Sequence, residues 1–264
     1  MAAQSIYVHA GMHKTGTSSI QRALAVNRKR LDGSGITVWD IDENHSLPLQ
    51  FLVRDFRRFK KSRQRERAAA AARRYGTPEM VRERLISALK SSRPKFLISA
   101  EGLCLVSEAE LRQFLRFIRH QSSRIIVVAY VREPMSLAHT LAQQRLKGGE
   151  TLDRIVSKVP FFSYRASLEK LFRVFGGESV RIRLYGQTHF SHGDLLTDFF
   201  DAIDESPEIA QEFPRSNLNQ SMSHNEAMLL NTVNRIARVE NRPGQFHWFA
   251  KRHLAACLRG PHSG

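Results

Sequence analysis

The sequence predicts an α/β protein, in which a central parallel sheet lies between two layers of helices as a three-layer sandwich. Short apolar segments alternate along the chain with longer segments whose apolar residues recur at helical spacing. Several of the short segments, such as IIVVAYV at 125–131, are apolar throughout. Continuous apolar runs are typical of parallel strands that are buried on both faces. Strands that alternate with helices also favour βαβ units, and hence a parallel sheet.

The individual elements follow from this reading in chain order. The expected strands are residues 5–10, 35–39, 95–100, 124–131 and 179–185. The expected helices are residues 18–30, 78–91, 107–121, 136–147, 164–175, 194–203 and 223–239. Serine side chains accept hydrogen bonds from the first amides of a helix, so we predict N-caps at Ser18, Ser107, Ser136 and Ser223. Glu226 stands three residues after Ser223, which is the spacing of a capping box.

We expect a single domain over residues 1–264, because a chain of this length can bury one sizeable core. Two regions lie outside the strand–helix alternation: a basic helical excursion around 50–92 and a helical C-terminal region at 223–260. Within the first, the basic, alanine-rich stretch 54–74 indicates either a solvated helix or a lid over a site. Within the second, residues 244–259 are amphipathic, basic and aromatic. They fit a helix packed on the core, a homodimer surface or a peripheral membrane contact.

Charge is the one unusual feature of the composition. Lysine and arginine number 41 and aspartate and glutamate 25, for a formal net charge of +16. This excess predicts an anionic partner, such as a nucleotide, an acidic glycan, nucleic acid or a lipid surface. Two cysteines are too few for a disulfide framework or a cysteine-based metal site. The N-terminus lacks the pattern of a secretory signal, and we therefore expect a cytoplasmic protein.

The segment GMHKTGTS at 11–18 follows the first expected strand and opens the first expected helix. In an open α/β sheet, ligands bind beyond the carboxyl ends of the strands, and a helix N-terminus there favours an anion. The P-loop pattern places a lysine directly after its second glycine. Here Thr17 takes that place and Lys14 stands before Gly16, so the lysine should meet a different part of a phosphate-bearing ligand.

The longer segment HAGMHKTGTSSIQ at 9–21 resembles the 5′-phosphosulfate loop of PAPS-dependent sulfotransferases, especially bacterial and carbohydrate sulfotransferases. PAPS is 3′-phosphoadenosine 5′-phosphosulfate, and PAP is the product that remains after transfer. The resemblance implies that Lys14 lies near the oxygen that bridges sulfuryl and phosphate. It also implies a set of residues that hold the 5′-phosphosulfate, namely Lys14, Thr15, Gly16, Thr17 and Ser18.

A second segment, RIIVVAYVREPMSLAHTLAQQ at 124–144, is similar to the family's 3′-phosphate site. Arg132 follows the apolar strand and matches the family arginine. Thr140 stands eight residues later, where the family usually has serine, and its hydroxyl can still donate to phosphate. The lysine- and glycine-rich C-terminal loop of animal cytosolic sulfotransferases is missing from this sequence, so membership of that branch is not expected.

Sulfuryl transfer to a hydroxyl needs a group that takes the acceptor's proton. Glu101 in KFLISAEGL comes directly after an expected strand, at the same sheet edge as the first loop, and resembles the glutamate taken as the base in many bacterial sulfotransferases. His13 is the alternative catalytic residue, and His9 falls at the end of the first strand. The histidines show no metal-binding spacing, and we expect no metal.

The resemblance thus implies sulfuryl transfer from PAPS to an acceptor hydroxyl by direct in-line displacement. The basic charge suits a carbohydrate or glycolipid as the acceptor. One alternative is a small-molecule P-loop kinase, in which Asp40 and Asp42 would serve as base or Mg²⁺ ligand. The other is a nucleic-acid-binding protein, suggested by the net charge of +16 and by the basic run at 54–74. The sequence lacks a recognised reading motif, and we expect no nucleic-acid partner.

Overall fold

The computed structural model describes residues 5–54, 62–90, 93–160, 162–211, 213 and 222–239. Contacts divide the chain into two compact units. The sheet unit comprises Met1–Arg132 and Ser163–Ser216, and the helical unit comprises Glu133–Phe162 and Asn217–Gly264. The expectation of a single sulfotransferase-like domain over 1–264 stays a prediction.

The sheet unit contains one five-stranded parallel sheet, which confirms the predicted α/β class. Its strands are β1 (Ser5–His9), β2 (Ile36–Val38), β3 (Lys95–Ser99), β4 (Arg124–Arg132) and β5 (Val180–Tyr185). Their order in the sheet is β2-β3-β1-β4-β5. Ser5 at the start of β1 is in register with Lys95 on one side and Arg124 on the other. The carboxyl ends of β3, β1 and β4 are therefore adjacent at one edge.

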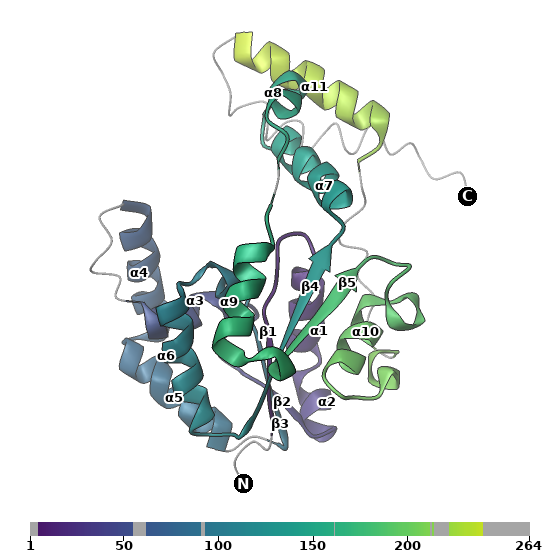
Figure 1. Ribbon diagram of the computed structural model, residues 1–264. Helices are drawn as coiled ribbons and strands as arrows, with labels where there is room; N and C mark the ends of the chain where they lie inside the picture. The colour runs from purple at the N-terminus through teal and green to yellow at the C-terminus, as the bar shows by residue number, and fades with distance from the viewer. Residues whose placement is uncertain are drawn as a thin grey trace. The chain divides into compact units, whose positions relative to one another are not determined.

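Helices cover both faces of this sheet, as the three-layer prediction requires (Figure 1). One face carries α1 (Thr17–Val26), α2 (Arg28–Gly33) and α10 (Leu195–Ala202). The other carries α3 (Ser46–Val53), α4 (Ser62–Tyr75), α5 (Pro78–Lys90), α6 (Glu108–Arg119) and α9 (Arg165–Phe175). Short 3₁₀ turns are η2 (Glu101–Leu105), η3 (Gly177–Ser179), η4 (Ser191–Gly193) and η5 (Pro207–Ala210). Each face of the sheet thus has its own apolar core.

The helical unit contains α7 (Pro134–Lys147), α8 (Leu152–Ser157) and α11 (His224–Val239). Two buried asparagines of α11 hold the connection between α7 and α8. Asn234 Nδ2 donates to the carbonyl oxygens of Leu146 and Glu150 at 2.8 and 2.7 Å, and Asn231 Oδ1 accepts from the Leu152 amide at 2.8 Å. These bonds satisfy backbone groups at the ends of two helices.

Two of the four predicted serine caps are confirmed. Ser107 and Ser223 each accept a bond from the amide of the glutamate three residues later, and that glutamate bonds back to the serine amide. The other two predictions are wrong. Gly16, in a left-handed conformation, precedes α1 instead of Ser18. Glu133 caps α7 instead of Ser136, because Pro134 suits the first helical position and the Glu133 carboxylate accepts from two amides.

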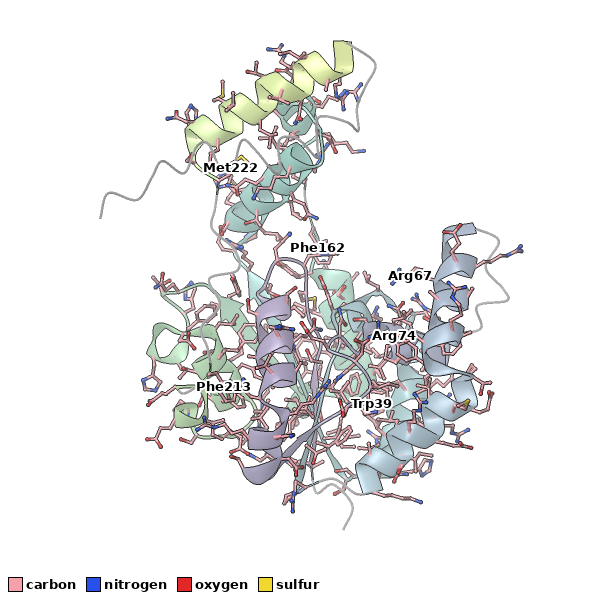
Figure 2. All side chains as sticks on the ribbon, turned by 180° about the vertical axis from the view of Figure 1, so that it is seen from behind. Trp39, Arg67, Arg74, Phe162, Phe213 and Met222 are labelled. Atoms are coloured by element: carbon pink, nitrogen blue, oxygen red, sulfur yellow. The ribbon has the colours of Figure 1, made fainter. Side chains whose placement is uncertain are left out.

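The expected helix at 18–30 is also wrong in detail, since it breaks at Asn27 into α1 and α2. The basic excursion contains α3, α4 and α5, while residues 55–61 lie outside the described part. Arg74, which is labelled in Figure 2, lies near the end of α4 and forms an ion pair with Asp42 at 2.9 Å. The lid role of 54–74 stays a prediction, and residues 244–259 lie outside the described residues.

Candidate functional site

Three functional candidates from the sequence follow three adjacent strands of the sheet unit. The loop with Lys14 follows β1, Glu101 follows β3, and Arg132 ends β4. The chain leaves β1 toward β2 on one side, and leaves β3 toward β4 on the other. β1 therefore stands at a topological switch point, where ligands of α/β proteins bind. The fold brings the three residues to the same edge of the sheet, and their roles in binding and catalysis stay predictions.

Two left-handed residues shape the loop between β1 and α1. Lys14 has φ 58° and Gly16 has φ 71°. The hydroxyls of Thr15 and Thr17 donate inward to the carbonyl oxygen of the buried Met12, at 2.9 and 3.5 Å. Both threonine hydroxyls therefore form hydrogen bonds within the loop in this structure. The exposed side chains of His13 and Ser18, together with the half-buried Lys14, lie toward solvent.

The loop amides provide a site for an anion. Within the described part of the chain, the backbone amides of residues 14–18 take part in no hydrogen bond. The last two also belong to the start of α1, where the helix dipole carries partial positive charge. Successive free amides around a left-handed turn form a concavity that binds phosphate and similar groups. This arrangement is chemically suited to a phosphate or phosphosulfate group.

Both loop glycines are needed for close packing. A Cβ on Gly11 would lie 2.5 Å from Thr17 Cγ2 and 3.0 Å from the Glu101 Cα. A Cβ on Gly16 would lie 2.3 Å from Leu195 Cδ2 and 2.9 Å from Tyr185 Cε2. The loop is thus fitted against η2 on one side and against α10 and β5 on the other.

Replacing Gly16 by alanine should destabilise the protein more than the same replacement at a left-handed glycine elsewhere in the chain. The left-handed backbone costs roughly 1–2 kcal/mol and the overpacking against Leu195 a further ~1–3 kcal/mol. Gly35 is the matched control, because its φ is +87° and a Cβ there meets nothing within 4 Å. Denaturant unfolding of Gly16→Ala and Gly35→Ala measures the difference. Equal losses in both variants would refute the tight packing at Gly16.

Arg132 lies against the same loop from the neighbouring strand. Its Nη1 donates to the Lys14 carbonyl oxygen at 3.3 Å, and its guanidinium stands 5.2 Å from the centre of the Tyr185 ring. The Arg132 amide donates to the Tyr164 hydroxyl at 3.2 Å. These contacts place the positive charge of Arg132 directly beside the first loop.

Glu101 and His13 face each other across the loop. His13 Nδ1 lies 3.8 Å from Glu101 Oε1, and both side chains are partly exposed, at 46% and 38%. The Glu101 turn is firmly held, since the Gly102 amide donates to Ser46 Oγ at 2.7 Å. Lys170 Nζ also donates to the Cys104 carbonyl oxygen at 2.8 Å. The carboxylate thus has a fixed backbone and remains accessible to a substrate hydroxyl.

His9 belongs to the core rather than to the accessible site. Its side chain is fully buried, and its Nδ1 lies 2.8 Å from Ser99 Oγ. Burial lowers the pKa of His9 to about 3, so the ring is neutral at physiological pH. Its ring packs against Phe199, with centroids 5.3 Å apart. A neutral, enclosed imidazole supports the end of β1.

Thr140 lies on α7 in the helical unit, where its hydroxyl donates to the Ser136 carbonyl oxygen at 3.0 Å. Its role as a 3′-phosphate ligand stays a prediction. Among the described residues, no group of three or more His, Cys, Asp or Glu side chains is arranged to hold a metal ion. The expectation that the protein uses no metal stays a prediction.

The two aspartates that a kinase would use are engaged by cations. Asp40 forms an ion pair with Arg28 at 2.6 Å. Asp42 pairs with Arg74 and also accepts a bond from the Tyr75 hydroxyl. Burial and this bond raise the pKa of Tyr75 to about 12, so the phenol stays a donor. Both carboxylates are thus already paired with cations in this structure, which disfavours the kinase alternative.

The sequence did not indicate several side chains that lie around the loop and come from later parts of the chain. Tyr185, Tyr164 and Leu195 contact Arg132 or Gly16, and Lys170 holds the Glu101 turn. Tyr185 carried a weak signal, because it ends an expected strand at the edge where ligands bind. The others become neighbours only through the strand order.

No helix in the described ranges combines the length and the apolar character needed to cross a lipid bilayer. No protein-family model matches the chain. A search of curated proteins found an uncharacterized protein of Archaeoglobus fulgidus that is 22% identical over 138 residues. That match covers 52% of this chain and 38% of the archaeal protein, so the similarity spans well under half of the relative's length.

Three solved structures are similar to this chain. A sulfotransferase from Alicyclobacillus acidocaldarius is 16% identical with a TM-score of 0.44, and the comparison covers 91% of this chain and 97% of that one. The sulfotransferase domain from the curacin biosynthetic pathway is 11% identical with a TM-score of 0.42, over 83% and 81%. A chain of the PezAT toxin–antitoxin system of Streptococcus pneumoniae is 13% identical with a TM-score of 0.36, over 90% and 87%.

Proposed function

We propose that the chain is a PAPS-dependent sulfotransferase, which moves a sulfuryl group from PAPS to an acceptor hydroxyl. The observation that carries this proposal is the loop at 11–18, with its run of unbonded amides, Lys14 at its centre and Arg132 against its carbonyl. Glu101 and His13 beside the loop supply candidate bases. The resemblance of 9–21 to a phosphosulfate loop names the anion that such a site would hold.

The residues present suit the donor. The free amides of 14–18 and the Ser18 hydroxyl would hold the 5′-phosphosulfate, with Thr15 and Thr17 contributing through their amides. Gly11 and Gly16 let the loop pack closely against its protein neighbours, which supports the backbone that carries these amides. Arg132 would hold the 3′-phosphate, and the same role for Thr140 stays an expectation from the sequence. Two anionic ends of one nucleotide would thus meet separate cationic groups.

The chemistry that PAPS supplies when bound is a transferable sulfuryl group. The Glu101 carboxylate accepts the proton of the acceptor hydroxyl, and that oxygen forms the new bond to sulfur as the bond to the phosphate oxygen breaks. The Lys14 ammonium stabilises the negative charge that develops on the departing phosphate oxygen. His13 either orients the Glu101 carboxylate or takes the proton in its place. PAP would be the product.

For the acceptor we propose a carbohydrate or a glycolipid, since the net charge of +16 suits an anionic glycan. Incubation with ³⁵S-labelled PAPS and matched panels of glycans, glycolipids and phenols tests this proposal. Label transferred to glycans but not to phenols is the expected result. Transfer to phenols alone would overturn the acceptor class while leaving the reaction in place. Absence of transfer to every acceptor, despite PAP binding, would contradict the enzyme assignment.

The kinase alternative makes a different prediction in a thermal-shift measurement. A ligand that binds only the folded state raises the unfolding temperature, and the rise grows with the ratio of the free ligand concentration to its Kd. We expect PAP to raise it clearly, with ATP·Mg²⁺ and oligonucleotides producing smaller shifts. A larger shift with ATP·Mg²⁺ would favour a small-molecule kinase, and a larger shift with oligonucleotides would favour a nucleic-acid-binding protein.

A further inference from the structure

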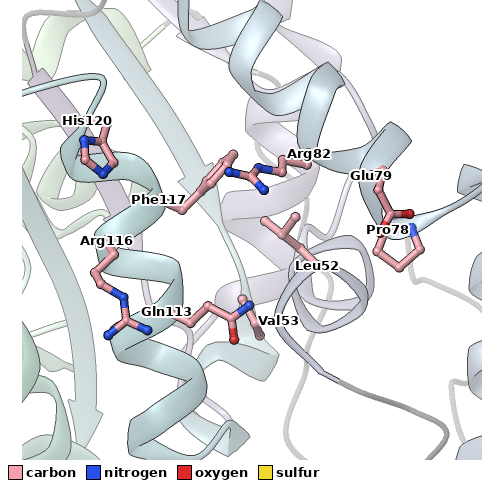
Figure 3. A pocket seen from close by; sticks show the side chains of 9 residues that line it. All are labelled: Leu52, Val53, Pro78, Glu79, Arg82, Gln113, Arg116, Phe117 and His120. Atoms are coloured by element: carbon pink, nitrogen blue, oxygen red, sulfur yellow. The ribbon is translucent and has the colours of Figure 1, made fainter.

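A cavity of about 430 Å³ lies in the sheet unit between α3, α5 and α6, and none of its lining residues belongs to the site described above (Figure 3). Its volume is within the range of roughly 300–1,000 Å³ found for small-molecule sites. Leu52, Val53 and Pro78 form apolar parts of its wall, and Phe117 adds an aromatic ring. The cavity is therefore large enough for a ring-sized ligand.

One face of α6 builds a side of this cavity. Gln113, Arg116, Phe117 and His120 line it, at spacings of three, four and seven residues from the first. Residues so spaced lie on one helical face. The half-buried Phe117 also packs against the core on this side of the sheet, as Leu52 does. The cavity thus has an apolar floor that is continuous with the core and a polar rim.

Two arginines on the rim lack an acidic partner among the residues that the structure describes. Within the described ranges, Arg82 and Arg116 form no ion pair with a carboxylate, whereas Arg112 on the same helix pairs with Glu108 at 2.7 Å. The Arg82 guanidinium stands 5.2 Å from the centre of the Phe117 ring, and Figure 3 shows the two side chains extending toward each other. A stacked guanidinium keeps its edge donors for an anion.

One carboxylate, that of Glu79, also lines the cavity. A bond from its own amide, followed by a bond from the Thr77 hydroxyl, lowers the pKa of Glu79. The Glu79 carboxylate therefore interacts with the N-terminus of α5, where the helix dipole favours a negative charge. The remaining rim charges are the two guanidinium groups, so the rim is cationic overall.

We propose that this cavity is a binding site for a small organic anion in which a carboxylate or a sulfate is attached to a flat apolar ring. Arg82 and Arg116 donate to the anion, Gln113 adds an amide donor at the rim, and Phe117 and Leu52 pack against the ring. Planar guanidinium groups match the two oxygens of a carboxylate or sulfate in a bidentate way. This site is independent of the proposed sulfotransferase activity.

Isothermal titration calorimetry of the full chain tests the site, with 2-naphthoate and 2-naphthyl sulfate as probes and 2-naphthalenemethanol as the uncharged isostere. Charge-assisted bonds predict that Arg82→Gln and Arg116→Gln each weaken probe binding roughly tenfold or more. Arg84→Gln on α5 and Arg119→Gln on α6 are matched controls outside the cavity, and should leave affinity within about twofold. The isostere should bind more weakly than either anion.

Saturating PAP should leave probe affinity unchanged, because the first loop is a separate site. Displacement of the probes by PAP, or equal affinity in Arg82→Gln and in the controls, would overturn the proposal. Unfolding temperatures of the variants check that they fold. As a second measurement, amide NMR shifts in the wild-type protein should change on α5 and α6 when a probe is added. Shifts confined to the loop at 11–18 would also contradict the proposal.

Discussion

Lys14→Ala is expected to lower kcat by roughly 10²–10³-fold, the effect of removing one preorganised donor to a developing oxyanion. The affinity for PAP should change only a few-fold, since the amides of 14–18 and Arg132 remain. Lys14 already adopts a left-handed backbone, with φ 58°, so alanine adds no new backbone strain. Single-turnover kinetics with labelled PAPS and PAP titration measure the two quantities separately.

Lys29→Ala is the control for general loss of positive charge, because Lys29 is an exposed lysine on α2. Its kinetics should match the wild type. If Lys14→Ala lowers kcat and PAP affinity in parallel, then Lys14 serves binding rather than the transfer step. Lys14→Arg adds a test of geometry, because a planar guanidinium replaces a compact ammonium.

Glu101→Gln is the second large effect that we expect, with a fall in kcat of roughly 10²–10⁴-fold for the loss of a general base. Glutamine keeps the size of the side chain and its place beside Gly11, so the loop packing should survive. PAP binding should stay near the wild-type value, because the carboxylate faces the acceptor.

His13→Gln distinguishes the two candidate bases, since His13 Nδ1 lies only 3.8 Å from Glu101 Oε1. If Glu101 takes the proton, His13→Gln costs less than Glu101→Gln, and the double variant costs little more than Glu101→Gln alone. A larger loss in His13→Gln would assign the base to His13. Additive losses would indicate two independent contributions.

The strands and the first loop were predictable from the sequence because both depend on local pattern. The apolar run at 125–131 and the glycine spacing at 11–16 each contain their own signal, and the structure has the strands and the turn there. Helix starts were less predictable. Serine is a good cap in general, but Gly16 takes the left-handed position and Pro134 fits the first turn of α7.

Contacts around the site depended on information that the local sequence lacks. The bond from Arg132 to the Lys14 carbonyl oxygen joins residues that are 118 positions apart. It exists because β4 lies beside β1 in the sheet. The cavity lined by Arg82 and Phe117 likewise forms only where three helices meet. The residue pattern of any one of these helices does not predict it. His9 is buried because Phe199 of α10 packs against its ring, and the sequence around His9 does not indicate this contact.

Calorimetric titration of PAP and of adenosine 5′-phosphate into the wild type and Arg132→Gln tests the central claim most directly. We expect PAP to bind the wild type at least tenfold more tightly than adenosine 5′-phosphate, since a charge-assisted contact to the 3′-phosphate contributes about 1.5–3 kcal/mol. We also expect Arg132→Gln to lose most of this preference. Equal affinities of the wild type for both nucleotides, or a preference unaffected by Arg132→Gln, would contradict it.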